Sequence, residues 1–188
     1  MKWEHINKDM VLSPVGLGFV FYSKGAVKDI PIGENYLEKE YWDGEKVGDH
    51  IRKGDIVSIC HGINSGEYEL RFRSGYPDDK IAEKYRAHLR LFIEVVGNEI
   101  NVIDLYQMMN WQDNCPKEQQ IEVEPGIYHL TFCGDASTFT AKDELSDEEY
   151  DALLEKPCVI YVHINRLEAI PENTWQGGVP YLWWAFEG

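Results

Sequence analysis

Two stretches of the chain share a pattern of alternating apolar and polar residues, which is typical of a half-buried β-strand. The pattern G-x-Y-x-L-x-F occurs at residues 66–72 and recurs at residues 126–132. Successive side chains of a strand point to opposite faces, so Tyr128, Leu130 and Phe132 share one face. We predict that these three are buried and that the residues between them face solvent, as in an antiparallel sheet with one wet face.

Turn residues between apolar runs predict three β-hairpins. Pro125 fixes φ for the first central position of a type II turn, and Gly126 accepts the positive φ that the second position needs. Gly97 and Asn98 form a two-residue hairpin signal. The hairpins would pair residues 55–63 with 67–73, residues 87–96 with 99–106, and residue 123 with residue 127 inside the stretch 121–135.

About nine candidate strands and one helix predict a mainly β protein, namely an antiparallel β-sandwich with one inserted α-helix at residues 146–156. Ser146 can cap this helix with Glu149 as its capping-box partner, and Pro157 ends it. A chain of 188 residues with 44% hydrophobic residues can bury a sizeable core. We therefore expect a single domain over residues 1–188.

Residues 24–50 mix glycine, proline and charged residues and show no strand pattern. They predict a long acidic connection, with a short helix at residues 34–41. Long structured connections are disproportionately binding elements, which makes this segment a candidate for contact with a partner. A solvated flap that covers a sheet edge is the alternative.

Acidic residues outnumber basic ones by 33 to 18, which gives a formal net charge of −15. Nucleic acid and anionic membranes would be repelled, so we predict neither as a partner, whereas a basic protein would be attracted. Acidity that only serves solubility is the alternative. The candidate partner-binding carboxylates are a dense cluster, Asp143, Glu144, Asp147, Glu148 and Asp151, and a second group, Glu38, Glu40 and Asp43.

Trp111 is the candidate aromatic anchor of the partner-binding surface. It lies in a predicted loop at residues 107–117, together with two methionines. Tryptophan is enriched among the few residues that hold most of the binding energy of an interface. A loop that packs against the sheets uses the same residue types, and in that alternative Trp111 is buried.

No catalytic or metal-binding motif stands out. The four cysteines, Cys60, Cys115, Cys133 and Cys158, are widely spaced and form no C-x-x-C pair, so we expect reduced thiols, no metal and no cofactor. Cys60 and His61 point to opposite faces of a strand, which excludes a nucleophile pair between them. No apolar run is long enough for a signal peptide or a membrane span, so we expect a cytoplasmic protein.

The last third of the chain resembles a family. The run V-x-P-G-x-Y-x-L-T-F at residues 123–132, followed after an acidic insert by V-I-Y-V-H-I-N at residues 159–165, is similar to the C-terminal part of small bacterial β-sandwich proteins of the competence-protein-J type. The resemblance implies a cytoplasmic bacterial protein that binds and inhibits a nuclease. In a wider sense it implies a role like that of a toxin-immunity protein.

Two functional hypotheses follow. The first is an inhibitor or immunity-like protein, not an enzyme, whose acidic surface covers a basic protein partner such as a nuclease or another toxin. The second is a hydrolytic enzyme or a small-ligand-binding sandwich with a pocket near Trp111, Tyr128 and His129. A pocket in which histidine and carboxylates converge would favour the second hypothesis.

Overall fold

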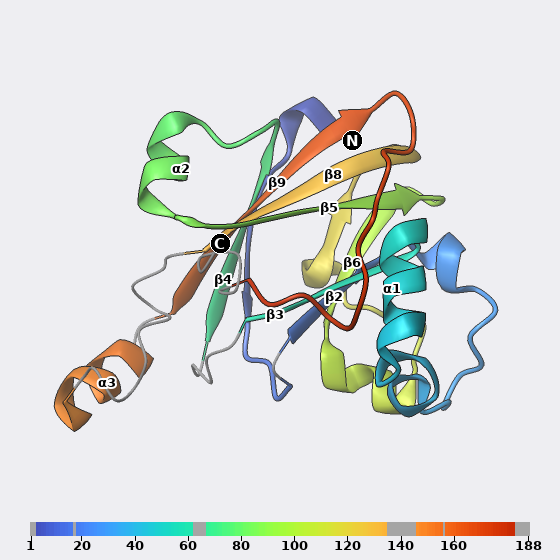
Figure 1. Ribbon diagram of the computed structural model, residues 1–188, viewed down its shortest axis with the longest axis horizontal. Coiled ribbons are helices and arrows are strands. Elements are labelled where there is room, and N and C mark those ends of the chain that lie inside the picture. The colour runs from blue at the N-terminus through green and yellow to red at the C-terminus, as the bar shows by residue number, and fades with distance from the viewer. Residues whose placement is uncertain (1–2, 17, 62–66, 135–145, 156, 183–188) are drawn as a thin grey trace.

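The computed structural model describes residues 3–16, 18–61, 67–134, 146–155 and 157–182, which contain nine strands in two sheets (Figure 1). The five-stranded sheet has the order β1-β4-β9-β8-β5, and the four-stranded sheet has the order β3-β2-β6-β7. Only β4 and β9 pair in parallel; the other pairs are antiparallel. The strands are β1 Asn7–Leu12, β2 Gly18–Tyr22, β3 Ile56–Cys60, β4 Tyr68–Ser74, β5 Ala87–Val95, β6 Glu99–Asp104, β7 Gln120–Glu122, β8 Gly126–Gly134 and β9 Cys158–Leu167.

Helices are short and few, as expected for a mainly β protein. The described α-helices are α1 Gly44–Lys53, α2 Asp79–Lys84 and α3 Asp147–Leu154. Short segments of other helical types are η1 Trp3–His5, η2 Lys24–Val27, the π-helix η3 Leu37–Tyr41, η4 Leu105–Asn110 and η5 Lys117–Gln119. No described helix is long and apolar enough to cross a membrane.

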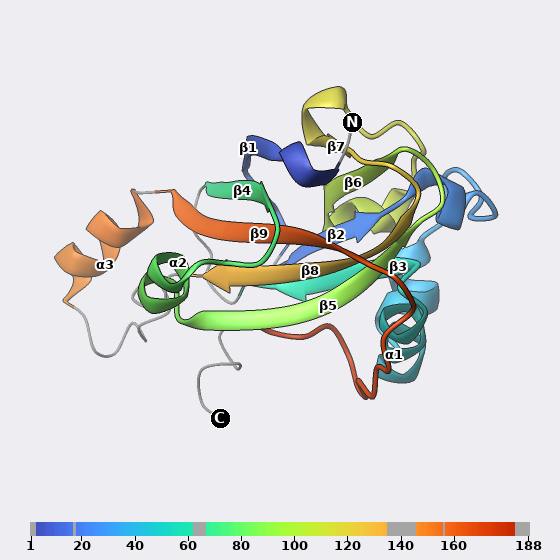
Figure 2. The same cartoon turned by 90° about the horizontal axis from the view of Figure 1, so that it is seen from above.

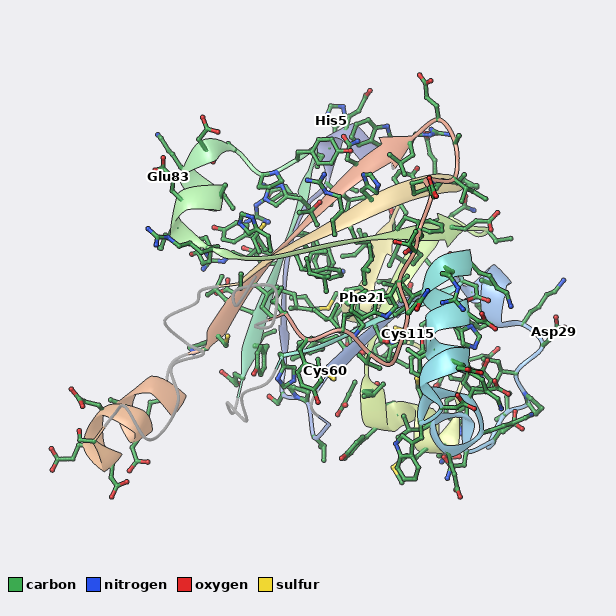
Figure 3. All side chains as sticks on the ribbon, viewed as in Figure 1. His5, Phe21, Asp29, Cys60, Glu83 and Cys115 are labelled. Carbon is green, nitrogen blue, oxygen red and sulfur yellow. The ribbon has the colours of Figure 1, made fainter. Side chains whose placement is uncertain are left out.

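Side chains from both sheets meet in a common apolar core. Tyr128, Leu130 and Phe132 of β8 are fully buried, which confirms their predicted inward face. The ring of Phe132 lies 5.1 Å, centroid to centroid, from the ring of Phe21 on β2. Phe21 lies centrally in the molecule (Figure 3). Contacts of this kind join the inward face of the five-stranded sheet to the four-stranded sheet.

All three predicted hairpins are wrong. In each of them the first and second strands belong to different sheets, because β3, β6 and β7 lie in the four-stranded sheet and β4, β5 and β8 in the five-stranded sheet. Gly126 has φ 156°, far from the value of about 80° in a type II turn. The N–H of Val123 donates to the carbonyl of Asn98 across 3.0 Å, and the Tyr128 hydroxyl donates to the carbonyl of Glu124 across 2.8 Å. The turn residues therefore reverse the chain, but the strand that follows each turn joins the sheet that the preceding strand does not belong to.

The outer face of β8 is less exposed than the alternation predicts. Thr131 and Cys133 are buried, because the segment between β4 and β5 folds back over this face of the sheet. In that segment the ring of Tyr85 lies 4.8 Å from that of Tyr161. Arg90 Nε donates to Thr131 Oγ1 across 3.0 Å. The polar pattern identified the outer face correctly, but tertiary contacts cover part of it.

The long connection predicted at residues 24–50 is largely helical. The short helix expected at residues 34–41 is present as the π-helix η3 over Leu37–Tyr41, whereas η2 and α1, which extends to Lys53, were not predicted. The Asp43 side chain caps α1 by accepting from the N–H of Glu45, and Gly54 ends the helix with φ 71°. Val47 and Ile51, one turn apart, are fully buried and fix α1 on the core.

Helix α3 begins as predicted. The backbone N–H of Ser146 donates to Glu149 Oε2 across 2.9 Å, and Ser146 Oγ accepts from the backbone N–H of Glu149 across 3.3 Å, which is the predicted capping box. The helix projects from one end of the molecule, whereas α1 lies at the other end (Figures 1 and 2). Near the end of the described chain, Tyr181 forms a single parallel bridge with Cys60, and residues 183–188 lie outside the described part.

Candidate functional site

Trp111 cannot serve as a surface anchor, which corrects the prediction. It is 1% exposed, and its ring lies 5.1 Å from the ring of Tyr22 in the core. The backbone N–H of Trp111 donates to the carbonyl of Glu34, and the backbone carbonyl of Trp111 accepts from the N–H of Gly33. The loop that carries Trp111 packs against the sheets and the segment at residues 33–34. The structure therefore shows the alternative, in which Trp111 is a buried residue of a packed loop.

Among the tryptophans of the described residues, Trp42 is instead the exposed one. It follows η3 directly and is 68% exposed. Its N–H donates to the carbonyl of Leu37 across 3.0 Å, so the backbone at this position is held while the indole side chain faces solvent. An exposed tryptophan is uncommon on a surface that has no partner, because the ring is large and mostly apolar.

Further exposed apolar side chains lie on segments that are joined to the segment that carries Trp42. The segments that carry them are tied together: the N–H of Val15 donates to Asp104 Oδ2 across 2.6 Å, and the hydrogen bonds of Gly33 and Glu34 join residues 31–43 to η4. Residues 31–43 and 104–111 lie toward the end of the molecule that carries α1, and the loop between β1 and β2, with residues 15–16, lies nearer the middle (Figure 1). We call this surface, formed by residues 15–16, 31–43 and 104–111, the η3–η4 face. Its exposed apolar side chains are Val15, Ile32, Trp42, Tyr106 and Met109.

Carboxylates flank Trp42 in the sequence of the η3–η4 face. Glu38 and Asp43 are exposed, and Glu40 is half-buried. Glu40 pairs with Lys46 across 3.6 Å, whereas Glu38 and Asp43 take no part in the ion pairs of the described residues. The structure thus brings the second predicted acidic group together with an exposed aromatic ring. An apolar centre with a charged rim is the usual anatomy of a protein-binding surface.

The first predicted acidic group lies elsewhere. Asp147, Glu148 and Asp151 are exposed on α3, and Asp143 and Glu144 lie outside the described residues. Helix α3 and the η3–η4 face are at opposite ends of the long axis of the molecule (Figures 1 and 2). The two acidic groups therefore cannot contact the same small area of a partner.

The alternative pocket near Trp111, Tyr128 and His129 does not form. Tyr128 faces the core, and Trp111 is buried against Tyr22. His129 points to the outer face of the five-stranded sheet, where Nδ1 lies 2.9 Å from the hydroxyl of Tyr76. Burial and, to a lesser extent, the charge of Arg90 lower the pKa of His129. These three residues line none of the main cavities in the described part of the chain.

A different cavity brings histidine and carboxylates together. It has a volume of about 200 Å³, and its polar lining comes from Asp29, Glu34, Tyr36, Lys39, His50 and Asp55. His50 Nε2 lies 3.0 Å from the Tyr36 hydroxyl, and His50 Nδ1 lies 2.8 Å from Asp55 Oδ1. Asp55 Oδ1 also accepts from the N–H of Ile56 across 2.7 Å. Asp29, at the opening of this cavity, is at the outer margin of the molecule (Figure 3).

The chain of hydrogen bonds through His50 holds its ring in one tautomer. The Asp55 carboxylate can only accept, so Nδ1 carries a proton, and in the neutral ring Nε2 accepts from the Tyr36 hydroxyl. Both ring nitrogens are therefore hydrogen-bonded, Nε2 to the Tyr36 hydroxyl and Nδ1 to the Asp55 carboxylate. Burial, followed by the charges of Glu40, Asp55 and Glu34, raises the pKa of Tyr36, so its hydroxyl stays protonated. Within the described residues, no group of three or more His, Cys, Asp or Glu side chains could hold a metal ion.

The sequence carried signals for this region that the pattern analysis passed over. Asp43 and Gly54 are ordinary start and stop residues for a helix, and ten residues lie between them. Trp42 stands in the polar run K-E-Y-W-D-G-E at residues 39–45. A tryptophan without apolar neighbours at strand or helix spacing has a weak reason to be buried. The spatial meeting of Tyr36, His50 and Asp55 left no such signal.

The described chain is thus a mainly β protein with two sheets and an acidic surface centred on exposed aromatic and aliphatic side chains. No protein-family model and no curated protein matches it. It is similar in structure to ComJ of Bacillus subtilis, an inhibitor of the DNA-degrading activity of NucA, with 15% identity and a TM-score of 0.49 over 86% of this chain and 98% of ComJ. It is also similar to a protein described as crocagin biosynthetic gene J, with 14% identity and a TM-score of 0.46 over 84% and 96% of the two chains.

The alignment with ComJ extends the weak resemblance from the last third to most of the chain. Both alignments concern the arrangement of the backbone. Likeness at this level does not carry a function from one protein to another.

Proposed function

We propose that this protein is an acidic binding protein of the inhibitor or immunity class, which neutralises a basic protein partner, a nuclease or another toxin, by covering its surface. The two sheets would form a sandwich, a single domain that presents the η3–η4 face. The observation that carries the proposal is the exposure of Trp42 close in the chain to Glu38 and Asp43, two exposed carboxylates that form no ion pair with the described residues. Tryptophan at the centre of an interface often accounts for a large part of the binding energy.

The charge of the protein gives this face its selectivity. A net charge of −15 repels nucleic acid and attracts a basic surface. The exposed acids of α3, at the far end, would steer the partner from a distance and would affect the association rate more than the affinity. We therefore assign anchoring to Trp42 with Glu38, Glu40 and Asp43, and steering to the α3 group of Asp143, Glu144, Asp147, Glu148 and Asp151.

The test compares wild type with Trp42→Ala as baits for proteins of the source cell. A supporting result is a basic protein that wild type captures, whose own activity wild type inhibits, and for which Trp42→Ala binds at least about tenfold more weakly. Ile170→Ala is the matched control, because Ile170 is similarly exposed, at 57% against 68%, but lies outside the η3–η4 face.

A salt series separates steering from anchoring. The association rate should fall as salt screens exposed charges over a Debye length of about 8 Å at physiological ionic strength. Charge reversal of Glu148 and Asp151 to lysine should slow association, with circular dichroism as the folding control. Equal affinities of wild type and Trp42→Ala, together with a flat salt dependence, would refute the proposed function.

A further inference from the structure

We infer that a cavity on the outer side of the four-stranded sheet binds a flat, uncharged heteroaromatic ring of the nucleobase kind. The cavity has a volume of about 380 Å³ and is lined by residues of β2, β6 and η4 and by the loop at residues 112–116. We call it the Tyr22 cavity. Its volume falls in the range of roughly 300–1,000 Å³ that is typical of small-molecule sites. The inference concerns a small molecule and does not rest on the proposed function.

A buried tyrosine in the wall of the Tyr22 cavity has a hydroxyl without a hydrogen-bond partner among the described residues. Phe21 faces the common core, so Tyr22, the next residue of β2, faces the other side of the sheet. Tyr22 is 2% exposed and packs against the ring of Trp111. Its hydroxyl is not one of the atoms that are closed off from solvent, so it opens into the cavity that Tyr22 lines. A hydroxyl in so buried a position favours a ligand that supplies the missing hydrogen bond.

The Tyr22 cavity is uncharged. Burial, followed by the charges of nearby Cys115 and Asp113, raises the pKa of Tyr22, so its hydroxyl keeps its proton. Burial also raises the pKa of the Cys115 thiol. No described residue that lines the cavity has an acidic or basic side chain of the Asp, Glu, Lys, Arg or His type. An ion would lose hydration here without gaining a counter-charge, so the cavity selects a neutral ligand.

The lining combines apolar surface with carboxamides. Ile103, Pro116 and the rings of Tyr22 and Tyr106 supply the apolar part. Four carboxamide side chains, which can each donate and accept, supply most of the polar part: Gln107, Asn110, Gln112 and Asn114. A heteroaromatic base has two apolar faces and an edge of donors and acceptors, so it matches both parts. A sugar carries hydroxyl groups all round its ring and would leave more of them against apolar surface.

The carboxamides have hydrogen-bonding capacity to spare. Gln107 Oε1 accepts from the N–H of Asp104 across 3.1 Å, and Gln112 Nε2 donates to Asn110 Oδ1 across 3.3 Å. The amino group of Gln107 and the whole carboxamide of Asn114 make no hydrogen bond with the described residues. Asparagine and glutamine pair through two hydrogen bonds with the edge of adenine, and aromatic side chains stack on the faces of bases. We therefore choose an adenine base as the model ligand.

The surroundings of the Tyr22 cavity disfavour a phosphate group. Asp113 stands between Gln112 and Asn114 in the chain, and Lys24, 3.4 Å away, is the one cation that pairs with it among the described residues. The net charge of −15 adds to the repulsion of an anion. A free base or a nucleoside should therefore bind better than a nucleotide.

The test uses adenosine as the probe, with ribose and adenosine 5′-monophosphate as comparison ligands. Binding to the full chain is measured by isothermal titration calorimetry, and the side-chain amide signals of asparagine and glutamine are followed by NMR. We expect saturable binding of adenosine with a dissociation constant on the order of a millimolar. Adenosine 5′-monophosphate should bind at least about tenfold more weakly, and ribose should not saturate.

Two variants locate the ligand in the Tyr22 cavity. Tyr22→Phe removes only the hydroxyl and should weaken adenosine about threefold or more, without lowering Tm, because no hydrogen bond within the described chain is lost. Asn114→Ala, at an exposed position, should weaken adenosine by a similar factor. The matched control is Tyr128→Phe, which removes a buried tyrosine's hydroxyl outside the cavity, where it donates to the carbonyl of Glu124. It should lower Tm and leave the affinity for adenosine unchanged.

The outcomes separate this inference from the proposed function. Saturable binding of adenosine that Tyr22→Phe weakens and Tyr128→Phe does not would support the inference. Absence of saturation, equal binding of ribose, or equal binding of adenosine 5′-monophosphate would overturn the assignment of an uncharged base. Unchanged affinity in both Tyr22→Phe and Asn114→Ala would overturn the Tyr22 cavity as the site. None of these results depends on whether Trp42→Ala changes the capture of a basic partner.

Discussion

The contact between Phe21 and Phe132 provides a direct test of how the two sheets pack. Phe21 lies on β2 of the four-stranded sheet and Phe132 on β8 of the five-stranded sheet, and both are fully buried. Their ring centroids are 5.1 Å apart with an interplanar angle of 56°, and aromatic pairs at such distances contribute about 0.5–1.5 kcal/mol beyond the area that they bury. If the sheets pack face to face as in a sandwich, replacing both rings should show a coupling of that size.

The perturbation is a double-mutant cycle with leucine. Truncation of Phe132 to alanine would cost about 3–5 kcal/mol, a large part of a typical stability of about 5–15 kcal/mol, and the double alanine variant could unfold. Phe21→Leu and Phe132→Leu should each cost about 0.5–3 kcal/mol and leave the double variant measurable. Urea unfolding at equilibrium, compared at a common urea concentration, gives the four free energies of unfolding.

The control for this cycle is Phe92→Leu. Phe92 is also buried on the five-stranded sheet, but it pairs with His129 and therefore points to the outer face, away from Phe21. Phe21→Leu and Phe92→Leu should add within about 0.3–0.5 kcal/mol. If Phe21 and Phe132 also add within that margin, their contact does not hold the sheets together and the sandwich arrangement loses its main support.

Three further predictions concern stability. Trp111→Ala should lower the free energy of unfolding by about 3–5 kcal/mol, whereas Trp42→Ala should change it by less than about 0.5 kcal/mol. Equal losses of stability in urea unfolding would contradict the burial of Trp111 and the exposure of Trp42. Gly54→Ala should cost more than about 1 kcal/mol, because Gly54 has φ 71° and an added Cβ would lie 2.5 Å from the Phe92 ring; an unchanged Tm would refute this. Burial lowers the pKa of His163, so the unfolded state binds more protons and stability should fall as pH drops below about 6.5. His163→Gln should flatten that slope in unfolding experiments between pH 7.5 and 5, and an undiminished slope would assign it to other groups.

The sequence predicted the strands better than their partners. Alternation identified the inward face of β8 because that face depends only on local side-chain direction. It could not distinguish a turn that closes a hairpin from one that carries the chain across the core, since both need the same residues. Pro125 and Gly126 occupy such a crossing between β7 and β8. Pairing is decided by which strands share a sheet, a nonlocal property that the turn residues do not encode.

The different burial of Trp42 and Trp111 shows a similar limit to what the sequence can predict about the site. Trp111 stands close to two methionines and Trp42 stands in a polar run, but neither setting shows whether the ring is buried. The backbone hydrogen bonds between residues 33–34 and Trp111 draw that loop inward, and they join segments more than seventy residues apart. The acidic groups near both ends of the molecule were visible in the sequence, but which of them surrounds an exposed aromatic ring depends on these long-range contacts.

Helix α1 explains how an acidic segment can form a defined binding surface. Its buried side chains, Val47 and Ile51, fix the helix on the core, while its N-terminal cap at Asp43 fixes the chain beside Trp42. At its other end, His50 is held by Asp55 across the Gly54 turn, so the cavity wall is tied to the start of β3. Association orders side chains at a cost of about 0.5–1.5 kcal/mol for each that was free. A segment that is already held at both ends avoids much of this cost, so residues 29–55 can combine high charge with the fixed geometry that recognition of one partner requires.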